Sequence, residues 1–253
     1  MKTFIRFSIY ISAVFVILFS CSKDSGSNSA AAAASGAGGS TAKFTISGNY
    51  LYVVDHTSLK SFDISSPSGP VLKDKTDIGI NIETIFPYGD KLFIGSSFSM
   101  HIYSLSNPAK PAKIARADYA IRMACDPVVA RDSVAYATLR ATGPCGGGQS
   151  ALVVYNIKDI SSPQLVRTVG LLSPYGLGVK DSALYVCLGS GGLQVFNVKN
   201  AYQPLFGNTI TNETFFDVIP YNNILICQVK GGFALYNIGS NPLQPVFLSK
   251  IFN

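Results

Sequence analysis

Three acidic residues occupy comparable places along the chain. Glu83, Asp126 and Asp217 each stand at or just before the start of an apolar stretch, and Asn81 and Arg122 lie close to them. If the stretches are brought round a common axis, the three carboxylates converge. A general acid and a general base at a defined separation are the machinery of glycoside hydrolysis. A hydrolase that acts on a glycan is therefore one hypothesis for this chain.

Other catalytic chemistries find little support in the residue types. The chain has two histidines, His56 and His101, and no closely spaced cysteine pair, so neither a Ser-His-Asp arrangement nor a zinc site can be argued. The run Gly146-Gly147-Gly148 follows no strand into a helix and is not a phosphate-binding loop. We therefore expect no metal and no cofactor.

A binding role requires less specific residues at the same positions than a catalytic role does. Each apolar stretch begins with a different residue, and Ala42 takes the equivalent place in the first. We therefore expect no catalytic residue and a protein that is not an enzyme, but a scaffold for a protein or glycan ligand. The expected contact residues are Glu83, Asp126, Tyr175, Phe215, Asp217 and Arg140.

The elements that position these residues follow from an internal repeat. An aromatic residue and a proline, separated by a polar turn, recur five times as Phe62/Pro70, Tyr103/Pro111, Tyr155/Pro163, Phe196/Pro204 and Tyr236/Pro245. The prolines are 41, 52, 41 and 41 residues apart. A fixed period of this length indicates one supersecondary unit copied along the chain.

The second copy shows what the unit is. Residues 83–88, 91–96, 100–105 and 110–115 are expected to be strands, separated by turn residues such as Gly89-Asp90 and Ser106-Asn107-Pro108. No stretch has a helical period of 3.6 residues. Four antiparallel strands in about 40 residues, repeated five times, predict an all-β fold, a five-bladed β-propeller of four-stranded antiparallel blades.

The first copy also resembles a known repeat family. Tyr52-Val53-Val54-Asp55, then Leu59 to Phe62, then Asp63-Ile64-Ser65-Ser66-Pro67 are similar to the LVIVD repeat. The other copies carry Ser104, Asn156, Asn197 or Asn237 where the first has Asp63. The resemblance covers residues 44–253 and implies a secreted or lipid-anchored bacterial propeller, mostly without an assigned activity.

The N-terminal residues predict where the protein is located in the cell. Lys2 and Arg6 precede an apolar run, so residues 1–20 are interpreted as a signal peptide, and Leu18-Phe19-Ser20-Cys21 resembles a lipobox in which Cys21 is lipidated. An ordinary signal peptide or an uncleaved anchor is the alternative. Residues 21–42, rich in Ser, Gly and Ala, are expected to form a flexible tether to the propeller of residues 43–253. We expect lipid anchoring in the outer membrane of a Gram-negative bacterium, facing the periplasm or the surface.

The charge excludes one class of partner. Without Lys2 and Arg6, 18 basic and 14 acidic residues remain, a net charge of +4, and the basic residues are scattered. Nucleic-acid binding requires a concentrated basic surface, so no nucleic-acid partner is expected.

The third copy is irregular. It is longer by the eleven residues 139–149, which include Arg140 and Cys145. Cys125 and Cys145 should lie on the same face of the propeller, so an oxidising compartment would permit a Cys125–Cys145 disulfide. The first copy begins with an innermost strand and the last ends with an outermost one. The first and last blades are therefore expected to share no strand.

Overall fold

The computed structural model describes residues 38–120, 127–146 and 148–252, all within one compact unit of residues 33–253. The expected signal peptide, Cys21, Cys125 and Asp126 lie outside the described residues. No helix among the residues described is long and apolar enough to cross a membrane.

The described residues form five four-stranded antiparallel sheets, each made of strands consecutive in sequence. The first sheet comprises β1 (Phe44–Ser47), β2 (Tyr50–Val54), β3 (Ser58–Asp63) and β4 (Val71–Asp77). The second comprises β5 (Ile82–Tyr88), β6 (Lys91–Ser96), β7 (Ser99–Ser104) and β8 (Ala112–Asp118). The third comprises β9 (Val128–Arg131), β10 (Val134–Leu139), β11 (Ala151–Asn156) and β12 (Gln164–Gly170), with a short 3₁₀ helix, η1 (Gly143–Cys145), between β10 and β11.

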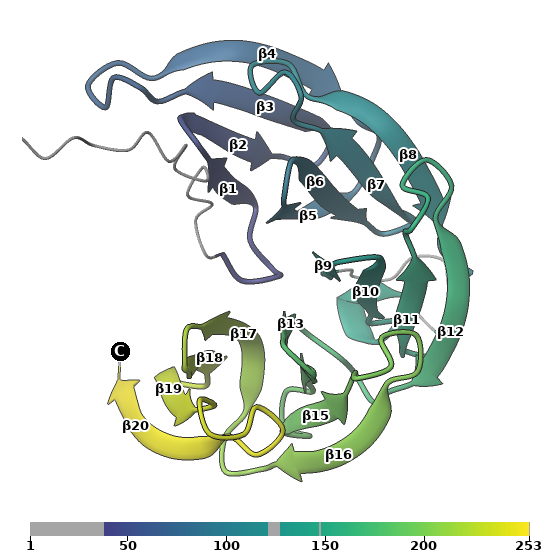
Figure 1. Cartoon of the computed structure of the whole chain (residues 1–253), viewed down its shortest axis with the longest axis vertical. Helices are drawn as coiled ribbons and strands as arrows, with labels where there is room; N and C mark the ends of the chain where they lie inside the picture. Colours follow the sequence, from purple (N-terminus) through teal and green to yellow (C-terminus); the bar gives the residue numbers. More distant parts are fainter. Residues whose placement is uncertain (1–37, 121–126, 147, 253) are drawn as a thin grey trace, which may run out of the picture. The chain divides into compact units, whose positions relative to one another are not determined.

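The remaining two sheets repeat the pattern. The fourth comprises β13 (Leu177–Lys180), β14 (Ala183–Cys187), β15 (Leu193–Asn197) and β16 (Leu205–Ile210). The fifth comprises β17 (Phe215–Tyr221), β18 (Ile224–Val229), β19 (Gly232–Asn237) and β20 (Val246–Phe252). In Figure 1 the first strand of each sheet lies nearest the centre and the fourth strand lies at the periphery. The predicted five-bladed propeller is confirmed.

The hairpin between the first two strands has the same turn geometry in every sheet. A two-residue turn joins them, and its first residue has a positive φ of 49–57°. Gly, Asp and Asn tolerate this conformation best, and these types occupy the five positions: Gly48, Gly89, Asp132, Asp181 and Asn222.

The turn between the third and fourth strands explains why Asp63 varies among the copies. In each sheet a side-chain oxygen at this position accepts a hydrogen bond from the backbone N–H two residues later, at 2.8–3.1 Å. The acceptors are Asp63, Ser104, Asn156, Asn197 and Asn237. Asp, Asn and Ser all form this turn, so the substitutions preserve its geometry.

Tyrosines of the second strands connect each of three sheets to the next. Tyr52 Oη donates to the Pro108 carbonyl (2.9 Å), Tyr136 Oη to Ala201 (2.7 Å) and Tyr185 Oη to Pro242 (2.6 Å). Each acceptor lies in the turn before the fourth strand of the following sheet. The repeated tyrosine therefore holds neighbouring sheets together as well as filling the core.

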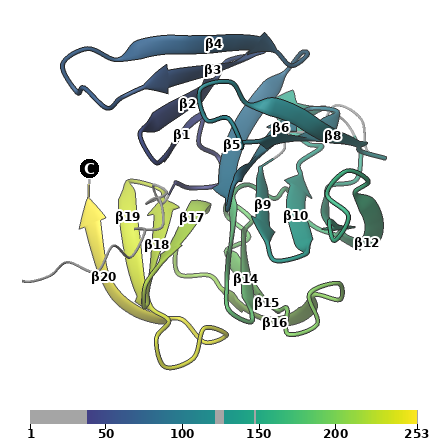
Figure 2. The ribbon, with the colours of Figure 1, turned by 45° about the horizontal axis from the view of Figure 1, so that its top comes forward.

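Apolar side chains fill the space between successive sheets. Four buried clusters lie between the first and second, second and third, third and fourth, and fourth and fifth sheets. At the two ends of the series apolar side chains stay exposed, as with Phe44 (61%) on β1 and Phe233 (41%) on β19. As predicted, β1 and β20 each pair only within their own sheet. Figure 2 shows the first and fifth sheets as separate layers.

Candidate functional site at the mouth of the propeller

A pocket of about 490 Å³ lies where four sheets meet, and we call it the mouth pocket. Its lining comes from the starts of innermost strands and from the loops between second and third strands. The lining residues are Thr41, Lys43, His56, Asn81, Glu83, Thr84, Ser97, Pro127, Arg140, Pro174 and Tyr175. Three of the predicted contact residues, Glu83, Tyr175 and Arg140, therefore line one pocket. Asp126 lies outside the described residues.

A β-bulge places Glu83 in the mouth pocket. Ile82 pairs with Ser96 and Thr84 with Gly95, so Glu83 is the extra residue on β5. Such bulges re-aim a side chain at the end of a strand. The Ser97 hydroxyl donates a 2.8 Å hydrogen bond to Glu83 Oε1, which fixes the carboxylate against the β6–β7 loop.

Arg140 and Tyr175 line the same pocket and contact each other. The Arg140 guanidinium carbon is 4.1 Å from the centroid of the Tyr175 ring, a cation–π contact. Tyr175 is held in place because its carbonyl accepts a 2.6 Å hydrogen bond from Thr138 Oγ1 and its ring packs edge-on against Phe216 at 5.4 Å. Arg140 Nε is buried and has no hydrogen-bond partner among the described residues.

The residues that line the pocket include more cationic than anionic side chains. Lys43 and Arg140 are cationic, Glu83 is the only carboxylate among the lining residues described, and no salt bridge between described residues involves any of the three. Lys43, His56 and Ser97 were not predicted as contacts. Their positions in the repeat could have predicted them. Each one precedes a first strand or follows a second strand, and these are the places where the chain reaches the mouth of the propeller.

Asp217, another expected contact residue, does not line the mouth pocket but takes part in a connection between sheets. Its side chain accepts hydrogen bonds from Ser40 Oγ (3.1 Å), Thr41 Oγ1 (2.6 Å) and the Thr41 amide (3.3 Å). Ser40 Oγ in turn accepts from the Leu177 amide at 2.8 Å, and the Ala42 carbonyl accepts from the Ile85 amide at 2.9 Å. Residues 38–42 thus connect the second, fourth and fifth sheets, and Asp217, 8% exposed, holds this connection.

Phe215, also an expected contact residue, does not line the mouth pocket either. It is fully buried in the cluster between the fourth and fifth sheets, with its ring 6.2 Å from that of Tyr236. The strand β17 has a register shift between Phe215 and Asp217, so Phe216 is the residue that reaches Tyr175. The aromatic residue of this sheet that packs against the pocket-lining Tyr175 is therefore Phe216, one residue after Phe215.

The loop of residues 139–149 lies beside a second, shallower space. A groove of about 640 Å³ is lined by Thr142, Gly148 and Gln149 of this loop and, among others, by Phe196 and Phe206 of the fourth sheet. Cys145 is disulfide-bonded. Because Cys125 lies outside the described residues, the Cys125–Cys145 pairing stays a prediction.

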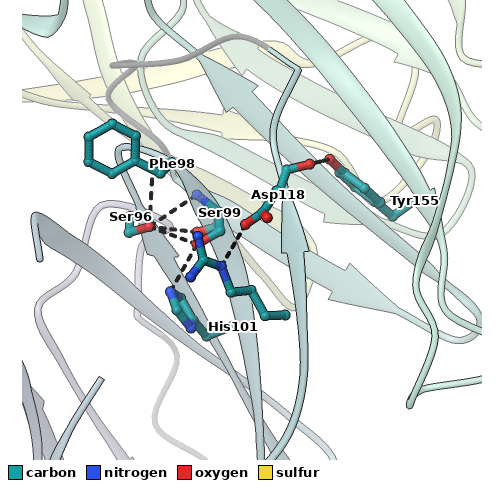
Figure 3. Close-up of polar contacts among 7 residues, drawn as sticks. Ser96, Phe98, Ser99, His101, Asp118 and Tyr155 are labelled. Carbon is teal, nitrogen blue, oxygen red and sulfur yellow. Dashed lines mark hydrogen bonds and ion pairs between the residues drawn. The ribbon is translucent and has the colours of Figure 1, made fainter. Parts of the chain in front are cut away.

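A buried serine–histidine contact in the second sheet offers no catalytic alternative. Figure 3 shows His101 turned toward Ser99, with 3.0 Å between Nε2 and the serine hydroxyl, and Ser96 beside them. Ser99 is 1% exposed and His101 3%, so no substrate reaches them. Burial, with lesser effects of Lys113 and Arg116, lowers the pKa of His101 to about 4.

The free cysteines and the metal-ligand types likewise form no reactive centre in the part of the chain that the structure describes. Cys187 and Cys227 are free and buried, and burial raises the pKa of both thiols, which keeps them protonated and unreactive. No group of three His, Cys, Asp or Glu residues among those described is placed to hold a metal ion.

Comparison with solved structures shows that other proteins share the fold, and it shows nothing about function. The periplasmic gluconolactonase PpgL of Pseudomonas aeruginosa is 13% identical, with a TM-score of 0.63 over 81% of this chain and 68% of that protein. A functionally unknown protein from Desulfotomaculum acetoxidans is 12% identical, with a TM-score of 0.65 over 81% and 66%. The computationally designed Ika8 protein is 13% identical, with a TM-score of 0.58 over 82% and 60%. This chain thus spans only 60–68% of the length of these proteins.

The gluconolactonase corrects one expectation. The sequence analysis expected a protein that is not an enzyme, but an enzyme has a similar fold at 13% identity. The architecture therefore gives no ground for excluding catalysis, and the enzymatic status of the chain is unresolved.

Sequence comparison identifies the repeat. A search of curated proteins finds no significant match to the chain. Residues 38–77, which include the whole first sheet, match the LVIVD repeat family. The chain therefore carries an LVIVD repeat in a five-bladed β-propeller.

Proposed function

We propose that this chain is a lipid-anchored propeller of the cell envelope that binds a glycan or protein ligand in its mouth pocket. The mouth pocket itself is the observation that supports the proposal. Four sheets contribute to it, and its volume falls within the range of about 300–1,000 Å³ typical of ligand sites. It combines an aromatic ring, a carboxylate and two cations, which suits a polar ligand of defined shape.

A binding experiment with two tyrosine variants tests this role. The purified full chain is screened against a glycan array and used to capture proteins from envelope extract. Tyr175→Leu is expected to reduce retention of the bound ligand about tenfold or more, because the ring supports Arg140. The control is Tyr221→Leu, since Tyr221 is 53% exposed on β17 and does not line the pocket. Equal retention by both variants would count against the pocket.

The proposed anchor is tested separately. Lys2, Arg6 and the apolar run before Cys21 support lipidation at Cys21 and residence in the outer membrane. Palmitate labelling is expected for the natural chain and should be lost in Cys21→Ala at an equal level of total protein. Labelling that persists in the variant would exclude Cys21 as the anchor.

Hydrolysis at the same pocket is the second candidate function, and Glu83 favours it. The carboxylate is fixed by Ser97 and lines the same pocket as Arg140 and Lys43. A general base beside groups that stabilise a developing oxyanion is the minimum for ester or lactone hydrolysis. A glycosidase pair is less well supported, because Asp217 is withdrawn into hydrogen bonds with residues 40 and 41. Turnover of sugar lactones by the natural chain, abolished in Glu83→Gln, would establish this candidate, and equal rates would exclude it.

A further inference from the structure

Arg140 has the character of a ligand-binding cation. Two of the described arginines, Arg131 and Arg140, are partly buried. Arg131 forms a salt bridge with Asp132, whereas Arg140 forms no salt bridge with a described residue and its buried Nε has no hydrogen-bond partner among them. A partly buried guanidinium that lacks acceptors loses hydration without compensation. An anion in the pocket would supply the missing acceptors.

The guanidinium is also held in place before any ligand arrives. Its contact with the Tyr175 ring, 4.1 Å from carbon to centroid, orients the planar group. A planar guanidinium presents paired N–H donors that match the two oxygens of a carboxylate. Phe216 packs against the ring, and Thr138 Oγ1 donates a hydrogen bond to the backbone carbonyl of Tyr175. Because both the ring and its backbone are held in this way, little side-chain entropy remains to be lost on binding.

The rest of the pocket favours an anion that also carries hydroxyl groups. Lys43 adds a second cation without a salt bridge in the described structure, and Glu83, the lining carboxylate, already accepts a hydrogen bond from Ser97. Asn81, Ser97 and Thr41 place amide and hydroxyl groups around the same space. Such groups hydrogen-bond sugar hydroxyls.

Resting on the proposed binding function, we propose that the mouth pocket takes a sugar acid, a polyhydroxylated ligand whose carboxylate is bound by Arg140 with support from Lys43. Glu83, Asn81 and Ser97 then hydrogen-bond its hydroxyl groups. The acid group determines selectivity, because the neutral counterpart of the same sugar leaves Arg140 without an acceptor.

The test compares acids with neutral sugars of the same size. The full chain is titrated calorimetrically with glucuronate, galacturonate and gluconate, and with glucose, galactose and glucitol as their counterparts. At least one acid is expected to bind about tenfold or more tightly than its counterpart, as one charge-assisted hydrogen bond provides. Arg140→Gln should abolish this preference, and Arg140→Lys, which keeps the charge but loses the planar fork, should retain part of it.

The matched control is Arg167→Gln, which removes the same charge from an exposed position on β12 outside the pocket. Thermal unfolding of each variant establishes that it is folded. Equal loss in the Arg140 and Arg167 variants, or equal binding of acids and neutral sugars, would overturn the sugar-acid inference. If neutral sugars bind to the natural chain and this binding is lost in Tyr175→Leu, the proposed binding function would stay intact. Absence of binding to every acid and neutral probe would overturn the inference, and the array and capture experiments would then decide the proposed function.

Discussion

His101 should make the stability of the propeller depend on pH in a defined window. The side chain is 3% exposed, its Nε2 faces the Ser99 hydroxyl, and its Nδ1 is buried without a partner among the described residues. Burial, with Lys113 and Arg116 nearby and Asp118 acting in the opposite direction, lowers its pKa from 6.5 to about 4. The fold therefore contains the neutral imidazole, and protonation favours the unfolded chain.

The sign and size follow from linkage. Between pH 4 and 6.5 the unfolded chain binds the proton that the folded chain rejects, so stability is complete above pH 6.5 and falls as the pH decreases. With a pKa of 6.5 in the unfolded chain and about 4 in the fold, the loss is about 2 kcal/mol at pH 5 and about 3 kcal/mol at pH 4.

Carboxylates act in a separate window. The pKa of Asp55 is lowered by its hydrogen bonds and ion pair with Lys60, and the pKa values of Asp63, Asp90 and Asp159 are lowered as well. Their stabilising effect is complete above about pH 5 and is lost progressively as the pH falls through their ordinary pKa of 3.8. Loss of stability between about pH 5 and 6.5 is therefore assigned to the histidine, and the carboxylates add to the loss at lower pH.

Urea unfolding followed by tyrosine fluorescence at pH 4.0, 5.0, 6.0 and 7.5 measures the effect, since the chain has no tryptophan. His101→Gln carries the residue found at the aligned position of the fourth sheet, Gln194, and should remove the dependence between about pH 5 and 6.5. His56→Gln, at the exposed second histidine, should retain it. The reasoning is refuted if the His101 variant loses stability with falling pH as steeply as the natural chain.

Three further predictions concern the connections between sheets. Tyr185→Phe removes the hydrogen bond to the Pro242 carbonyl and should lower the free energy of unfolding by about 0.5–1.5 kcal/mol, whereas Tyr221→Phe, at an exposed position, should change it little in the same urea assay. Equal effects would show that the hydroxyl of Tyr185 adds nothing. Asp217→Asn should cost about 2 kcal/mol, because one acceptor oxygen of a multiply hydrogen-bonded carboxylate becomes a donor. Gly176→Ala should independently destabilise by about 1–3 kcal/mol, since the added methyl group would overlap the Asp217 side chain; a neutral result for either would contradict the tight packing around this carboxylate.

The repeat predicted the fold because each copy contains the local residues that determine its turns. The positive-φ position of the first hairpin and the acceptor before the fourth strand are local features, decided within a few residues. Even the change from Asp63 to Asn156 keeps the same hydrogen bond. Strand number and order therefore follow from the sequence without knowledge of contacts between sheets.

The site was only partly predictable, because two details are not local. Asp217 and Glu83 look equivalent in sequence, but Asp217 bonds to Thr41, 176 residues away, and no periodicity reveals that contact. Phe215 and Phe216 differ by one position, and a register shift on β17 decides which of them packs against Tyr175. A shift of one residue exchanges the two faces of a strand, so the pattern of apolar residues alone could not select the correct phenylalanine.

The residues that hold the propeller together and those that line its mouth differ in one respect. The tyrosines of the second strands and the acceptors before the fourth strands recur from sheet to sheet, whereas Glu83, Arg140 and Tyr175 each occur in a single sheet. A repeated residue is explained by a structural role that every copy shares. A partly buried arginine that occurs once, packs on a fixed ring and forms no salt bridge with any described residue has no such explanation. Its placement is accounted for by a ligand that is bound by one face of the propeller at one position, and this is why Arg140 is the residue to substitute first.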